Sequence, residues 1–253
     1  MTFSRPCLFP LAALALTLGL PQPQAQTVLY QEDFTGEEGK GQIGTQSDLA
    51  GVSWTIDTVN GSFEDNNDSF AVVQAGGNEF FQARDVDADY TDNEKLVTWT
   101  SPAIALGSSG GAPLLFAFEA AADGSFEPRD QTGGDVFDVS LQLSGGSEGS
   151  ASSTLPLFTS SVENGSLHFG AQALTPNLEP FSQTIGSSAL GSFTTANLVI
   201  GMTNHADNEL QSFDQLSVTA IPEPSSSGFL VGAFALGTVL TFRWRRQHWR
   251  GKR

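Results

Sequence analysis

The chain has 253 residues, of which 28 are acidic and 11 are basic, so its formal net charge is −17. Nucleic acid and anionic lipid would repel so acidic a chain, and we expect no nucleic-acid partner. Its single cysteine, Cys7, excludes an intramolecular disulfide framework and a cysteine-based metal site.

Residues 1–25 are typical of a secretory signal peptide. Arg5 supplies a short positive region, and residues 8–20 form an apolar segment of suitable length. An uncleaved membrane helix is the alternative, but this segment is short for a bilayer. We expect cleavage after Ala25 and export of residues 27–221, which we call the body.

The body is the most acidic part of the chain. Its only lysines and arginines are Lys40, Arg84, Lys95 and Arg129, which stand against 27 acidic residues. Such a surface stays soluble and attracts divalent cations or cationic polymers.

Hydrophobic periodicity predicts an all-β body. Phe137, Val139, Leu141 and Leu143 alternate with polar residues, and the same period of two recurs at 52–56, 114–118, 198–202 and 216–220. Turn-forming glycines and asparagines lie between these runs, as at 60–61, 76–78, 107–111, 133–134, 144–149 and 164–165. We predict a two-layer antiparallel sandwich with Greek-key or jelly-roll connections. A right-handed β-helix, the alternative, would need a coil-length repeat that we do not find.

Three short segments favour the jelly roll within this class. They are Leu-Tyr-Gln-Glu-Asp-Phe at 29–34, Trp-Thr-Ser-Pro-Ala-Ile at 99–104 and Phe-Asp-Gln-Leu-Ser-Val at 213–218. They resemble the edges of concanavalin-like and MAM-type jelly rolls of extracellular proteins, a resemblance that implies the fold but no ligand.

Two acidic runs offer oxygen ligands for calcium. Asp85, Asp87 and Asp89 alternate along the chain, as a loop around Ca²⁺ requires. This run is no EF-hand, because Tyr90 replaces the turn glycine and Leu96 the bidentate glutamate. The run at 64–68 is similar but less regular. A solvated acidic loop is the alternative for both.

A second calcium prediction rests on strand parity. Asp214 shares parity with Leu216 and Val218, and Glu32 shares parity with Tyr30 and Phe34. First and last strands of jelly rolls often lie side by side, so both carboxylates would point inward and converge. With so few cations in the body, Ca²⁺ is a suitable partner for Glu32 and Asp214. The alternative is that both acids lie in water at strand ends.

The body lacks a recognisable catalytic pattern. His168 and His205 are its only histidines, and neither a Gly-x-Ser-x-Gly elbow nor a zinc-binding histidine spacing accompanies them. We therefore expect a non-enzymatic structural or adhesive protein. A carbohydrate-binding, lectin-like module is the alternative, and a glycoside hydrolase with paired carboxylates is a third reading. Aromatic residues near polar loops would form a sugar platform if exposed, or the core if buried: Phe63, Phe70, Phe80, Phe81, Tyr90, Trp99 and Phe126.

The last segment of the chain predicts where the protein is located in the cell. Pro222, Glu223 and Pro224 precede a nearly uncharged run at 225–242, which as a helix would span about 27 Å, close to a bilayer core of about 30 Å. A basic cluster follows, and it should stay cytoplasmic: Arg243, Arg245, Arg246, Arg250, Lys252 and Arg253.

This order of triplet, apolar helix and basic end resembles the PEP-CTERM sorting signal of bacterial surface proteins. The resemblance covers only residues 222–253. It implies that an exosortase cuts at or near Pro222-Glu223-Pro224 and passes the body from the inner membrane to the envelope, the surface or an exopolysaccharide matrix. A plain tail anchor with a proline-stiffened linker is the alternative.

Overall fold

The computed structural model of the chain describes residues 26–88, 96–107, 112–129, 134–146 and 152–221. The predicted signal peptide, Pro-Glu-Pro triplet, membrane helix and basic cluster lie outside these residues and stay predictions. Within the described part of the chain, no helix is long and apolar enough to cross a bilayer.

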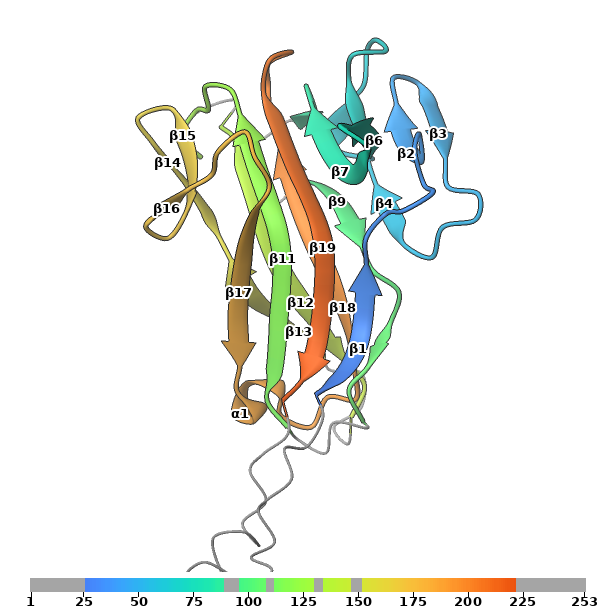
Figure 1. Cartoon of the computed structure of the whole chain (residues 1–253), viewed down its shortest axis with the longest axis vertical. Coiled ribbons are helices and arrows are strands. Elements are labelled where there is room, and N and C mark those ends of the chain that lie inside the picture. Colours follow the sequence, from blue (N-terminus) through green and yellow to red (C-terminus); the bar gives the residue numbers. More distant parts are fainter. Residues whose placement is uncertain (1–25, 89–95, 108–111, 130–133, 147–151, 222–253) are drawn as a thin grey trace, which may run out of the picture. The chain divides into compact units, whose positions relative to one another are not determined.

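The body is a sandwich of two large antiparallel sheets, which confirms the predicted fold class (Figure 1). The eight-stranded sheet has the order β17-β11-β19-β7-β6-β2-β3, and β1 pairs with β19. Its strands are β1 (Thr27–Glu32), β2 (Gly41–Ile43), β3 (Gln46–Asp48), β6 (Ser69–Ala75), β7 (Asn78–Arg84), β11 (Leu114–Asp123), β17 (Glu179–Ile185) and β19 (Leu210–Ala220).

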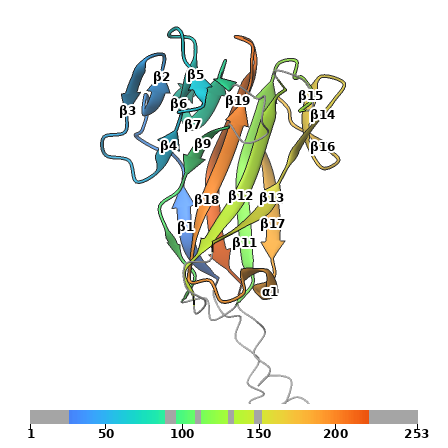
Figure 2. The ribbon, with the colours of Figure 1, turned by 180° about the vertical axis from the view of Figure 1, so that it is seen from behind.

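The six-stranded sheet has the order β13-β12-β18-β9-β4, and β10 pairs with β18. Seen from behind, its long strands cover those of the first sheet (Figure 2). Its strands are β4 (Thr55–Asp57), β9 (Val97–Thr100), β10 (Ile104–Ala105), β12 (Val136–Ser144), β13 (Ser153–Phe158) and β18 (Thr195–Thr203). The remaining elements are β5 (Gly61–Ser62), β8 (Asp87–Ala88), β14 (Ser160–Glu163), β15 (Ser166–Phe169), β16 (Gln172–Ala173) and the one-turn helix α1 (Ser187–Leu190).

The sequence patterns match most long strands. The alternating apolar residues of β11 and β12 are buried, and the glycine-containing turns at 76–77 and 164–165 close the β6–β7 and β14–β15 hairpins. Asn164 and Gly165 have φ of 53° and 77°, values that only asparagine and glycine adopt readily. The pattern at 52–56 was less accurate, since β4 begins at Thr55 and leaves Val52 outside it.

The core between the sheets is centred on Phe213 of β19. Its ring stacks on Phe81 with centroids 5.0 Å apart and meets Trp99 and Phe34 edge-on at 5.6 Å. Because Trp99 belongs to the six-stranded sheet, these contacts join the two layers. Phe70, Phe81, Trp99 and Phe126 are all at most 4 % exposed, so these four candidates for a sugar platform belong to the core.

A bulge in β19 corrects the predicted parity of Asp214. The register against β11 shifts between Ala117 and Glu119, and Gln215 has a φ of 51°. Phe213 and Leu216 therefore both face the core, and Asp214 lies on the outer face opposite Glu119. Asp214 is nevertheless 1 % exposed.

Removing the ring of Phe213 should test this account of the core. We expect Phe213→Ala to lower the free energy of unfolding by about 3–5 kcal/mol, because it leaves a cavity among rings from both sheets. Val59→Ala is the control, since Val59 is 89 % exposed and should change stability by less than about 0.5 kcal/mol. Chemical denaturation measures both, and equal stability of the two variants would refute the central position of Phe213.

Candidate functional site

A pocket of about 370 Å³ opens on the outer face of the eight-stranded sheet. Strands β7, β19 and β11 form its floor, because Phe81, Phe213 and Ala120 point into the core and their neighbours point out. The segment before β17 supplies one wall. The lining residues are Ala75, Asn78, Phe80, Gln82, Ala121, Ala122, Asp123, Pro176, Asn177, Leu178, Leu210 and Ser212.

The lining combines hydrogen-bonding groups with one aromatic ring. Gln82 donates to the hydroxyl of Ser212 at 3.2 Å, and Asn78 donates to Asp214 at 2.9 Å, so both amides are held in place. Phe80 is half-buried and lies beside them. Among the described residues, no lysine, arginine or histidine lines the pocket, and Asp123 is the only carboxylate that does. A neutral ligand with many hydroxyl groups would suit this surface.

Sequence reasoning named Phe80 but missed the polar residues around it. Gln82 and Ser212 occupy outward positions of strands whose inward positions are apolar, a signal visible in the sequence. Asn177 comes from a segment far away in the chain, and only the fold brings it to the pocket.

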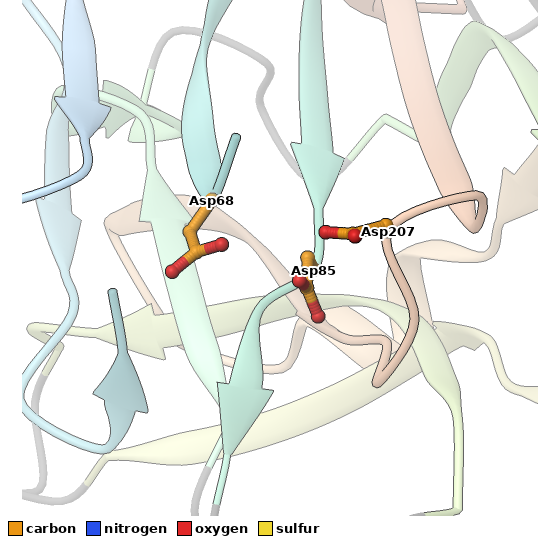
Figure 3. A group of neighbouring side chains, drawn as sticks. All are labelled: Asp68, Asp85 and Asp207. Carbon is orange, nitrogen blue, oxygen red and sulfur yellow. The ribbon is translucent and has the colours of Figure 1, made fainter. Parts of the chain in front are cut away.

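Asp85 joins a group different from the predicted one (Figure 3). It lies with Asp68 and Asp207, and one carboxylate oxygen of each falls within 4.8 Å of the others. Asp68 precedes β6, Asp85 follows β7, and Asp207 lies in the turn between β18 and β19. Asp68 already accepts hydrogen bonds from the amides of Glu64 and Asp65, the latter at 3.0 Å.

The other members of the alternating acidic run are placed elsewhere. Asp87 lies in β8, where it pairs with Ser62 of β5, and Asp89 lies outside the described residues. The acidic run at 64–68 contributes Asp68 to the group, so the structure joins the two runs through one residue of each.

Glu32 and Asp214 come from neighbouring strands, because β1 pairs with β19 as predicted. Their carboxylates take separate partners. Glu32 accepts from the amides of Asp33 and Phe34 at 3.1 and 3.0 Å, whereas Asp214 accepts from Asn78 and from the amide of Gln215 at 2.7 Å. Glu32 pairs with the core-facing Leu216, and the bulge turns Asp214 to the outer face.

Both acids are harder to ionise than usual. Burial raises the pKa of Glu32, and the charges of Glu37 and Asp33 raise it further. Burial also raises the pKa of Asp214, with a smaller contribution from Asp33. Calcium binding at Glu32 and Asp214 stays a prediction, as it does for the group at Asp85.

A calcium titration of the melting temperature distinguishes these locations. An ion that binds only the folded body should raise the melting temperature as the ion concentration rises. At a hundred times its dissociation constant, the ion should add about 2.7 kcal/mol to the free energy of unfolding. If the ion binds between Glu32 and Asp214, the double variant Glu32→Gln with Asp214→Asn should abolish this rise. If it binds at the three aspartates of Figure 3, Asp68→Asn with Asp207→Asn should abolish it instead. If millimolar calcium leaves the melting temperature of the chelator-treated body unchanged, both calcium predictions are wrong.

The two histidines of the body do not converge. His168 lies in β15, and its Nδ1 is buried without a hydrogen-bond partner. His205 lies in the β18–β19 turn with its Nδ1 3.4 Å from Asp135. This placement provides no histidine pair for zinc.

The chain matches no protein-family model and no curated protein at a significant level. Solved structures similar to it include the CBM22-1–GH10 modules of a Clostridium thermocellum endo-1,4-beta-D-xylanase 10B complexed with xylohexaose, at 11 % identity and a TM-score of 0.42. That match covers 76 % of this chain and 28 % of the xylanase chain.

Two smaller proteins are covered almost completely. The CBM22-1 xylan-binding domain of Paenibacillus barcinonensis Xyn10C has 10 % identity and a TM-score of 0.40, with 79 % of this chain and 98 % of that chain covered. The K3 cleaved adhesin domain of Lys-gingipain from Porphyromonas gingivalis has 12 % identity and a TM-score of 0.38, with 77 % and 99 % covered.

Proposed function

We propose that the body is a non-enzymatic module that binds a neutral glycan in the pocket on the outer face of the eight-stranded sheet. The observation that carries this proposal is the lining: amides, a hydroxyl and one carboxylate beside the ring of Phe80, with no cationic side chain among the described lining residues. The volume of about 370 Å³ falls within the range of about 300–1,000 Å³ that is usual for small-ligand sites.

Each group has a role in holding a sugar. The amides of Gln82 and Asn177 can donate to and accept from ring hydroxyls, and Asp123 can accept from two of them. The face of Phe80 offers an apolar surface for the C–H side of a sugar ring. An anionic sugar would meet Asp123 and the acidic surface without a compensating cation, so the proposal specifies a neutral one.

The same lining argues against hydrolysis in this pocket. Most glycoside hydrolases flank the scissile bond with two carboxylates, one as acid and one as nucleophile or base. Within the part of the chain that the structure describes, Asp123 is the only carboxylate that lines the pocket. A purely structural or adhesive body without a small ligand is the second candidate, and the strongly acidic composition favours it.

Binding to an array of neutral glycans tests the proposal. Phe80→Ala should weaken binding about two- to tenfold, because stacking on one ring contributes about 0.5–1.5 kcal/mol. Gln82→Ala should weaken it by a similar factor through the lost hydrogen bonds. Gln142→Ala is the matched control, since Gln142 is exposed on β12 of the other sheet.

Three results would count against the proposal. They are binding that both pocket variants leave unchanged, no binding to any neutral glycan, and hydrolysis of a bound glycan that Asp123→Asn abolishes. The first would move the ligand site elsewhere on the body, the second would favour the structural candidate, and the third would make the protein an enzyme.

We also propose that the tail sorts the body to the envelope or matrix, as its resemblance to a PEP-CTERM signal implies. The mature surface form should then lack residues 228–253, because processing occurs at or near Pro222-Glu223-Pro224. Mass spectrometry of surface material tests this. An intact tryptic peptide that ends at Arg243, recovered from that material, would show that the tail is retained and would favour the plain anchor.

A further inference from the structure

A buried carboxylate lies beside the pocket on the outer face of the eight-stranded sheet. The bulge in β19 turns Asp214 out of the core, yet Asp214 is only 1 % exposed. Both of its oxygens are engaged: one accepts from the amide of Gln215 at 2.7 Å, and the other accepts from Nδ2 of Asn78 at 2.9 Å. The pocket is lined by Asn78 and not by Asp214. Asp214 therefore acts on the pocket through Asn78.

The contact with Asp214 fixes how the amide of Asn78 is oriented. An ionised carboxylate only accepts hydrogen bonds, so the atom of Asn78 that meets it is the amide nitrogen. Within the described residues, nothing donates to the carbonyl oxygen of the same amide. Asn78 is exposed, so water can supply that hydrogen bond in the empty pocket. A ligand that displaces this water must supply the hydrogen itself.

Asp123 offers a second acceptor at the other end of the pocket. It is exposed, and its ionised carboxylate also accepts only. Asp123 pairs with Leu210 of β19, and Asp214 lies four residues after Leu210 on the same strand, which separates the two levels by about 13 Å. This span is longer than one sugar ring. The two acceptors therefore face different rings of a glycan chain.

The groups between the two ends make no comparable demand. Gln82 donates to the hydroxyl of Ser212 at 3.2 Å, and this hydroxyl can itself donate to or accept from a ligand. Phe80 supplies an apolar surface beside them. The requirement for a donor on the ligand is thus concentrated at Asn78 and Asp123.

We propose that the pocket selects glycans by their free hydroxyl groups, and that Asp214 is the positioning residue for this selection. A free hydroxyl can donate to the carbonyl oxygen of Asn78 and to the carboxylate of Asp123. An O-methylated or O-acylated position cannot, and it leaves the acceptor unpaired once water is displaced. The ligand class is an unsubstituted stretch of a neutral glycan. This inference rests on the proposed glycan binding and adds the chemical form of the glycan.

An array that carries each neutral glycan twice, once with free hydroxyls and once fully O-methylated, tests the selection. Methylation keeps the glycan neutral and keeps its oxygens as acceptors, but it removes every hydroxyl donor. A chelator in the buffer keeps calcium from competing for Asp214. The parent body should bind the free form at least about tenfold more tightly than the methylated form.

The array separates failure of this inference from failure of the proposed function. Equal or tighter binding of the methylated form would overturn the selection and leave glycan binding standing. If neither form of any glycan binds, the proposed function is wrong, and the selection with it.

The variant Asp214→Asn separates hydrogen bonding from the bulk of the methyl groups. The new side chain keeps one acceptor for the amide of Gln215 and turns its own amide nitrogen to Asn78. Asn78 must then direct its carbonyl oxygen to that nitrogen and its N–H groups to the ligand, where they can donate to an ether oxygen. The preference for the free form should fall about two- to tenfold relative to the parent. A merely structural effect would weaken both forms alike.

Glu119→Gln is the matched control. Glu119 lies opposite Asp214 on β11 and does not line the pocket, so its loss of charge should leave the parental preference unchanged. If Asp214→Asn does not fold, Asn78→Ala serves instead, because Asn78 is exposed. It should weaken binding of the free form about two- to tenfold and leave the methylated form nearly unchanged. A preference that neither variant alters would overturn the role of Asp214.

Discussion

The rest of the sandwich depends on how β19 shares its second edge between two strands. One edge of β19 pairs with β11 along its length, whereas the other pairs with β7 at Leu210–Phe213 and with β1 at Leu216–Ala220. The bulge at Asp214 and Gln215 lies at the change of partner. It lets Phe213 and Leu216 both reach the core, so one strand anchors both halves of the eight-stranded sheet.

Sequence periodicity was sufficient for the strands whose two faces differ. In β11 and β12 the inward residues are apolar and the outward ones are mostly polar or small, so fold class and facing could be predicted. The bulge could not be predicted, because Gln215 adopts a positive φ and glutamine is not a residue type that favours one. The pocket and the grouping of the aspartates were also not predicted, since Asn177 reaches the pocket, and Asp68 reaches Asp85 and Asp207, only through long-range packing.

In a body with so few cations, backbone amides donate hydrogen bonds to several of the carboxylates. Asp138 accepts from the amide of Ser160 at 3.0 Å besides pairing with Arg129, and Glu79 accepts from the amide of Glu37 at 3.0 Å. Glu32 and Asp68 likewise accept hydrogen bonds from backbone amides of adjacent loops. Carboxylates thus organise the connections of this fold as lysine and arginine pairs would in a more balanced chain. The acidic composition is therefore part of the architecture, and not only a property of the surface.

The pairing of Thr27 with Ala220 has a consequence for how the body folds. The first and last strands of the body are neighbours, and β19 is also the partner of β7 and β11. The eight-stranded sheet therefore cannot be completed until the end of the body is available. Such distant pairings make folding slow, because a long loop of chain must be ordered before they form. Were the body exported with its N-terminus first, as we propose, its eight-stranded sheet would remain incomplete until nearly all of the body had passed the membrane.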